Sequence, residues 1–189
     1  MQSPNLFQSV FSKHNISVGV DIGNFSVKVA QIKQKRFPKE RYLSFGIREI
    51  GKEKSHDTIV GAIKEASSDA KIESNKVNLS VYGPEIIMRY ITLPSLELNE
   101  LSRCLEFELE RYVPGKKKES MVIDYKILYS LLNNQMVVFL IALERQIIED
   151  RINLVKEAGL TPNSINIDSL VLMNAYNAAQ LYSKEVMAI

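Results

Sequence analysis

The feature that most constrains the fold is a short stretch near the N-terminus, SVGVDIGNFSVKVAQI, at residues 17–32. Its first half alternates apolar residues with small or polar ones, which is the pattern of a strand with one buried face. The pair Gly23-Asn24 favours a tight turn, and residues 27–32 return as a second alternating strand. The stretch therefore predicts a β-hairpin.

The bend of this hairpin carries residue types that suit phosphate. Asp21 stands just before Gly23, and Lys28 follows on the returning strand. Backbone N–H groups of a turn can form an anion-binding nest, a lysine can neutralise phosphate oxygens, and an aspartate can hold a magnesium ion or its waters. The same pattern also occurs in purely structural hairpins, so these residues are consistent with either a phosphate site or a plain turn.

Composition narrows the class of protein. The 189 residues are 46% apolar, enough for a packed core, and the net charge of +2 gives no broad electrostatic reason to bind nucleic acid. The single cysteine, Cys104, cannot form an internal disulfide and suits a reducing cytoplasm. The sequence contains neither an apolar run of the ~20 residues that span a bilayer nor a signal-peptide pattern. We therefore expect a cytoplasmic protein, or one held at a membrane by another molecule.

The periodicity predicts an amphipathic arm at residues 1–15, which could lie on a membrane, enter a partner's groove or fold back on its own domain. After the hairpin we expect a strand, a helix and a strand, at residues 41–50, 55–71 and 77–82. Gly83-Pro84 breaks the last of these strands.

Residues 85–159 read as a unit with the order strand, helix, strand, strand, helix, which ends at Gly159. A strand at 164–167 follows, and Asp168 caps a final helix to about residue 182. That helix is apolar almost all round, so we expect it to be buried. The pattern contains no catalytic constellation and no metal-ligand cluster.

Three blocks resemble known proteins. The Asp21-x-Gly23 motif with its following lysine resembles the first phosphate loop of the actin, Hsp70 and sugar-kinase superfamily. Residues 83–114, which contain GPEIIMRYITLP and LEFELERYVP, are similar to the corresponding block of the PilM family of type IV pilus assembly proteins. Residues 154–176, LVKEAGLTPNSINIDSLVLMNAY, match that family in order and register. The resemblance spans about residues 16–182.

This resemblance implies an α/β, actin-like (ribonuclease H-like) fold. Subdomain 1A would comprise residues 16–84 and 160–189. An inserted α+β subdomain, called 1C or SHS2 and shared with the division protein FtsA, would comprise residues 85–159. The second actin-like half carries its own Asp-Ile-Gly loop, which this sequence lacks. We therefore expect the N-terminal half of a PilM-like protein.

The resemblance also implies a function. The chain would be a cytoplasmic adaptor of the type IV pilus, or of a related type II secretion system, peripheral at the inner membrane. Its partner would be a PilN-like bitopic membrane protein, whose cytoplasmic N-terminal tail would enter a groove between the actin-like half and the inserted subdomain. The alternative is an FtsA-like nucleotide-dependent ATPase or polymerising protein, and self-association is compatible with both. ATP and Mg²⁺ would be cofactors of full-length relatives, and we expect this chain alone to bind neither appreciably.

Two sets of site residues follow from the resemblance. The nucleotide-binding set is Asp21, Gly23, Asn24, Phe25 and Lys28, with Asp21 also holding Mg²⁺. Phe25 stands where the family usually has a small hydroxyl residue, and Asn24 replaces a Thr or Ser, which removes a hydroxyl from the phosphate and metal shell. The partner-binding candidates are Arg89, Tyr90 and Tyr125. No catalytic residue is expected.

Overall fold

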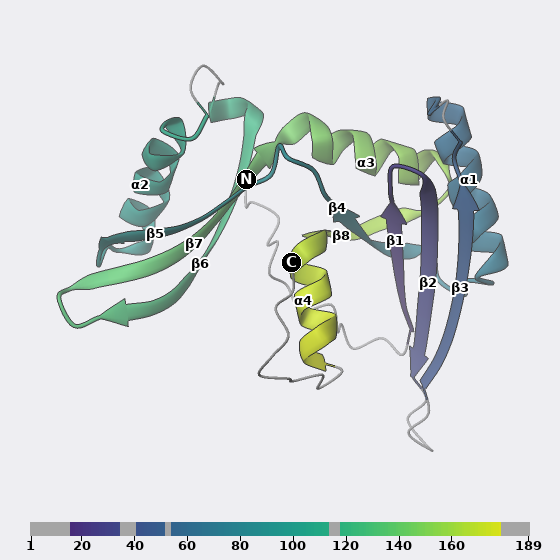
Figure 1. Cartoon of the computed structure of the whole chain (residues 1–189), viewed down its shortest axis with the longest axis horizontal. Coiled ribbons are helices and arrows are strands. Elements are labelled where there is room, and N and C mark those ends of the chain that lie inside the picture. The colour runs from purple at the N-terminus through teal and green to yellow at the C-terminus, as the bar shows by residue number, and fades with distance from the viewer. Residues whose placement is uncertain (1–15, 35–40, 52–53, 114–117, 179–189) are drawn as a thin grey trace. The chain divides into compact units, whose positions relative to one another are not determined.

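The computed structural model describes residues 16–34, 41–51, 54–113 and 118–178. The chain forms two compact units (Figure 1). Within the described ranges, the middle unit comprises residues 83–150, and the hairpin unit comprises residues 16–82 and 151–178. The amphipathic arm expected at residues 1–15 lies outside the described residues.

The hairpin unit is built on a five-stranded sheet with the order β3-β2-β1-β4-β8. Its strands are β1 (Ile16–Ile22), β2 (Ser26–Gln34), β3 (Arg41–Glu49), β4 (Lys76–Val81) and β8 (Thr161–Ile167). The first three form an antiparallel meander, whereas β4 runs parallel to β1 and β8 runs parallel to β4. The predicted hairpin therefore supplies the central strands of this sheet.

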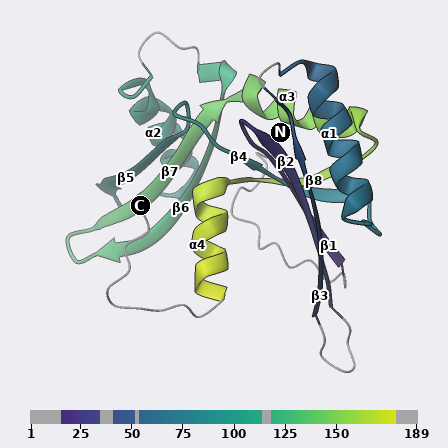
Figure 2. The same ribbon diagram turned by 45° about the vertical axis from the view of Figure 1, so that its right-hand side comes forward.

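Helix α1 (His56–Asp69) covers one face of the sheet, over β2 and β3 (Figures 1 and 2). The helix begins after Ser55, whose Oγ accepts the N–H of Thr58 at 3.1 Å and so satisfies one free helix donor. Alternate apolar side chains of β1 and β2 pack beneath α1, in a core that includes Val18, Val20, Ile22, Val27, Val29, Ile63 and Ala66. Since side chains alternate along a strand, Asp21 and Lys28 lie on the opposite face.

The middle unit is a three-stranded antiparallel sheet with the order β5-β7-β6 and a helix packed on one face. Its elements are β5 (Ile87–Pro94), α2 (Leu98–Glu110), the short 3-10 helix η1 (Lys118–Ser120), β6 (Met121–Leu131) and β7 (Gln135–Glu144). Leu101 and Leu105 of α2 pack with Val138 and Leu140 of β7. The central strand β7 is buried along nearly all its length, as its continuous apolar run predicts.

The second crossing between the units differs in position from the sequence expectation. The sequence placed it after Gly159, whereas it falls between Asp150 and Arg151, inside helix α3 (Arg145–Glu157). The physical reason is packing, because Leu154 and Val155 are buried in the core of the hairpin unit. The second half of α3 therefore belongs to that unit.

Helix α4 (Asp168–Ala178) also differs from expectation. Its apolar pattern predicted burial on nearly every side, but Val171, Leu172 and Met173 are exposed. The main neighbours of α4 are β8, which directly precedes it, and β4, and no residue from Asp168 to Asn177 is buried. The apolar pattern of a helix predicts which of its faces can be buried. It does not predict whether another element packs against those faces.

Candidate functional site

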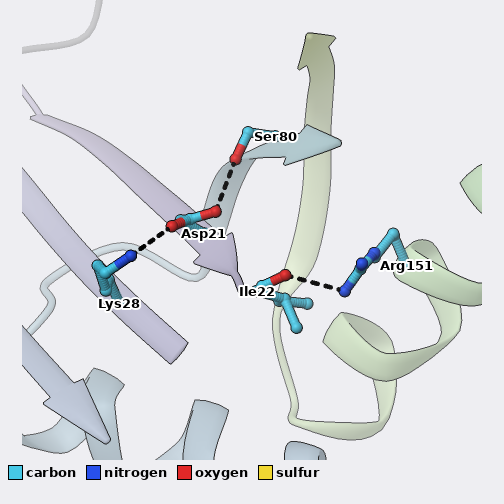
Figure 3. Close-up of polar contacts among 5 residues, drawn as sticks. All are labelled: Asp21, Ile22, Lys28, Ser80 and Arg151. Atoms are coloured by element: carbon cyan, nitrogen blue, oxygen red, sulfur yellow. Dashed lines mark hydrogen bonds and ion pairs between the residues drawn. The ribbon is translucent and has the colours of Figure 1, made fainter. Parts of the chain in front are cut away.

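The candidate phosphate residues gather at the end of β1 (Figure 3). Asp21 and Lys28 lie directly opposite each other in the β1–β2 register, and Lys28 Nζ lies 3.0 Å from Asp21 Oδ2. Ser80 of β4 donates from Oγ to Asp21 Oδ1 over 3.2 Å. The Asp21 carboxylate is therefore held from both neighbouring strands while it stays partly open to solvent.

Backbone hydrogen bonds hold the turn that follows Asp21. The Gly23 N–H donates to the carbonyl oxygen of Ser26 at 2.9 Å, and the Ile50 N–H donates to the carbonyl oxygen of Phe25 at 3.0 Å. The Gly23 N–H is thus already engaged, so it does not contribute to the anion-binding nest that the sequence suggested. The Asp21 and Lys28 side chains beside this turn stay partly open to a ligand.

Lys54 adds a second cation that the sequence did not single out. Its Nζ donates to Asn24 Oδ1 at 3.2 Å and lies 5.8 Å from the centroid of the Phe25 ring. The Phe25 side chain is 79% exposed, so Lys54 covers only part of it. Asn24 and Phe25 lie far from Lys54 in the sequence, and no motif links them, so only the fold could reveal this contact.

Arg151 is a further residue that sequence reasoning missed. Its Nη1 donates to the carbonyl oxygen of Ile22 at 3.1 Å (Figure 3). Its guanidinium lies 5.7 Å from the centroid of the Tyr82 ring. Ile22 ends β1 directly after Asp21, and Tyr82 is the last residue before the first crossing. Arg151 therefore contacts both the turn end of the hairpin, at Ile22, and Tyr82, which follows β4.

Together these groups suit a phosphate more than a bare metal ion. Lys28 and Lys54 supply positive charge, and Asp21 supplies a carboxylate of the kind that holds Mg²⁺ together with phosphate oxygens. Within the described ranges, no three His, Cys, Asp or Glu side chains are grouped closely enough to hold a metal on their own.

The three partner-binding candidates lie in the middle unit but not in one place. Arg89 and Tyr90 are consecutive residues of β5, on opposite faces of the sheet. The Arg89 guanidinium lies 5.4 Å from the centroid of the Tyr112 ring. Tyr90 is 73% exposed and stacks on Phe139 with centroids 4.9 Å apart. Tyr125 lies on β6, packs beside α2, and its hydroxyl lies 3.4 Å from Ser102 Oγ.

The helices of the structure, over the ranges that it describes, include none that is both long and apolar enough to cross a membrane.

Comparison with known proteins places the chain in a family. The sequence matches the family model for the type IV pilus assembly protein PilM over residues 19–187. A chain of the PilM-PilN type IV pilus biogenesis complex is similar in structure, with a TM-score of 0.71 at 20% identity over 86% of this chain and 50% of that chain. The cytoplasmic domain of EpsL, an inner membrane component of the type II secretion system of Vibrio cholerae, is similar with a TM-score of 0.51 at 11% identity, over 82% of this chain and 58% of that chain. No curated protein matches the sequence.

These matches confirm the predicted α/β, actin-like fold, and the chain spans about half the length of the PilM-PilN complex chain that it matches. The family model covers most of the sequence, including the blocks around residues 83–114 and 154–176. The chain therefore belongs to the PilM family of type IV pilus assembly proteins.

Proposed function

We propose that this chain is a cytoplasmic adaptor of the type IV pilus assembly platform, which binds the cytoplasmic N-terminal tail of a PilN-like bitopic inner-membrane protein. The observation that carries the proposal is the match to the PilM family over residues 19–187. The fold similarity to a chain of the PilM-PilN complex supports the same partner. In this role the chain is peripheral at the inner membrane and is held there by its partner.

The middle unit offers a suitable surface for an extended tail. β5 is an edge strand of its sheet, and edge strands present backbone donors and acceptors to which an added strand can bind. Arg89 and Tyr90 are both exposed on this strand and point to opposite faces. A tail paired with β5 would therefore contact Arg89 with side chains of one face and Tyr90 with side chains of the other.

A recruitment assay tests this function. Vesicles that carry the PilN-like protein are mixed with the purified chain and sedimented, and the matched control carries the same protein without its cytoplasmic tail. We expect the chain to sediment with the intact protein and to stay in solution with the tail-deleted one. Equal sedimentation of the chain with both kinds of vesicle would contradict binding to the tail.

A second candidate function is nucleotide binding, as in an FtsA-like ATPase or polymerising protein. The observation that favours it is the placement of Lys28, Lys54 and Asp21 around one hairpin. In longer family members ATP phosphates and Mg²⁺ would meet this hairpin, at Asp21, Gly23, Asn24, Phe25 and Lys28.

We expect this chain on its own to bind ATP only weakly. Asp21 and Lys28 are partly exposed and already paired, so their charges are screened by water and a phosphate must displace an existing ion pair. Equilibrium dialysis with labelled ATP, with and without Mg²⁺, measures this affinity. A Kd of about 1 μM that depends on Mg²⁺ and is lost in Asp21→Ala would overturn the expectation.

A further inference from the structure

Among the residues that the structure describes, no element covers the outer edge of the hairpin unit, where strand β3 carries an apolar face. β3 is the edge strand of the five-stranded sheet, and it pairs with β2 in continuous register from end to end. On the face away from α1 its Leu43, Phe45 and Ile47 side chains are 67%, 64% and 49% exposed. The strand has no proline and no bulge, which are common protections of a sheet edge.

The sequence of β3 is complementary to itself in the antiparallel sense. Phe45 is the central residue of the strand, Leu43 and Ile47 are equidistant from it, and Arg41 and Glu49 are its two ends. If two copies pair antiparallel about Phe45, each Arg41 lies opposite Glu49 of the second copy, and each Leu43 lies opposite Ile47 of the second copy. Opposite charges and apolar pairs placed directly across two strands are the pairs that stabilise a sheet.

Other registers lack this match. A shift of one residue places Arg41 opposite Arg48 of the second copy in one direction, where like charges are destabilising, and opposite Ile50 in the other, where Arg41 has no opposite charge. A shift of two residues leaves a charged end without an opposite charge. Arg41 and Glu49 make no ion pair with each other or with another side chain among the described residues, so both are available for the second copy.

We propose that two copies of this chain associate through β3, with a twofold axis at Phe45, to form one continuous sheet. The two ends of the interface are Arg41–Glu49 ion pairs, and its centre is the apolar cluster of Leu43, Phe45 and Ile47 from both copies. The interface is isologous, so it closes as a dimer and leaves no free β3 edge. This proposal does not depend on tail binding by β5, which lies in the other unit.

Charge reversal of the full chain tests the register directly. Arg41→Glu alone sets two glutamates opposite each other at both ends of the interface, and Glu49→Arg alone sets two arginines opposite each other. We expect each single variant to raise the dimer dissociation constant by about tenfold or more, measured by sedimentation velocity over a concentration series.

The decisive sample is an equimolar mixture of the two single variants. In a mixed dimer every glutamate at these positions faces an arginine, so we expect dimers to return in the mixture and in the double variant Arg41→Glu/Glu49→Arg. The return of dimers also shows that the single variants are folded. A monomeric wild-type chain, single variants that dimerise like wild type, or a mixture that stays monomeric would each overturn the proposal.

A disulfide provides an independent measurement. In a Cys104→Ser background, Phe45→Cys places a thiol on the twofold axis, and mild oxidation should link two copies. The matched control is Gly61→Cys on α1, where a side chain meets open space, which should not link copies at the same rate. Equal rates at both positions would contradict pairing about Phe45.

Discussion

At the scale of single residues, Gly46 sets how closely α1 packs on the sheet. A Cβ atom at this position would overlap the carbonyl oxygen of Ala66 and press on Asp69, both in α1. Gly46→Ala must therefore push the helix away from β3, and overpacking of this kind costs about 1–3 kcal/mol in the free energy of unfolding. Urea denaturation followed by circular dichroism measures the loss.

The matched control for Gly46→Ala lies two strands away in the same sheet. A Cβ atom added to Gly19 meets nothing within 4 Å, so Gly19→Ala should leave the free energy of unfolding unchanged or raise it slightly. If both variants lose the same stability, close packing of α1 is not the reason for Gly46.

Only some of the side-chain contacts around the hairpin could be predicted from the sequence. Asp21 and Lys28 could be placed together from the sequence, because a two-strand hairpin with a short turn fixes its own register. The contacts of Lys54 and Arg151 with the hairpin could not be predicted, since both residues lie outside the hairpin in the sequence. The engaged N–H of Gly23 could not be predicted either, because the turn geometry decides which donors are free.

At the scale of elements, the contact of α3 with the end of β1 is the one most open to test. Arg151→Met keeps an unbranched, apolar stem but removes the charged donor to the Ile22 carbonyl oxygen. Hydrogen bonds to charged groups contribute about 1.5–3 kcal/mol, so we expect faster amide exchange in residues 22–27 and lower stability. Hydrogen exchange read by mass spectrometry measures both.

Arg145→Met is the control for Arg151→Met, because Arg145 lies exposed at the start of the same helix. It should leave exchange in residues 22–27 unchanged. If the two variants change the hairpin equally, the effect arises from helix propensity or net charge and not from the contact with Ile22.

The strands were easier to predict from the sequence than the tertiary contacts of the helices. The alternating pattern of β1 and β2 and the continuous apolar run of β7 each specify a strand by residue type, and all three form as predicted. The crossing inside α3 and the exposure of α4 depend instead on contacts between distant segments, which periodicity does not encode.

At the scale of the whole molecule, the fold class and the family followed from three ordered sequence blocks, and both are confirmed. The partner surface could not be assembled from the sequence alone, because Tyr90 lies on the opposite face of the sheet from Arg89 and Tyr125, which both pair with Leu140. A near-neutral charge of +2 offers no long-range attraction to single out a partner. We therefore propose that recognition rests on local contacts, such as an added strand and the Tyr90 ring.

The most direct measurement is isothermal titration of a synthetic peptide, the cytoplasmic N-terminal tail of the PilN-like protein, into the purified chain. We predict a Kd of about 1 μM for the wild-type chain and for Phe107→Ala, which removes an exposed aromatic side chain from α2 of the same unit. We predict a Kd about tenfold weaker or more for Tyr90→Ala. No heat of binding with a folded wild-type chain, or equal weakening by both variants, would contradict tail recognition at β5.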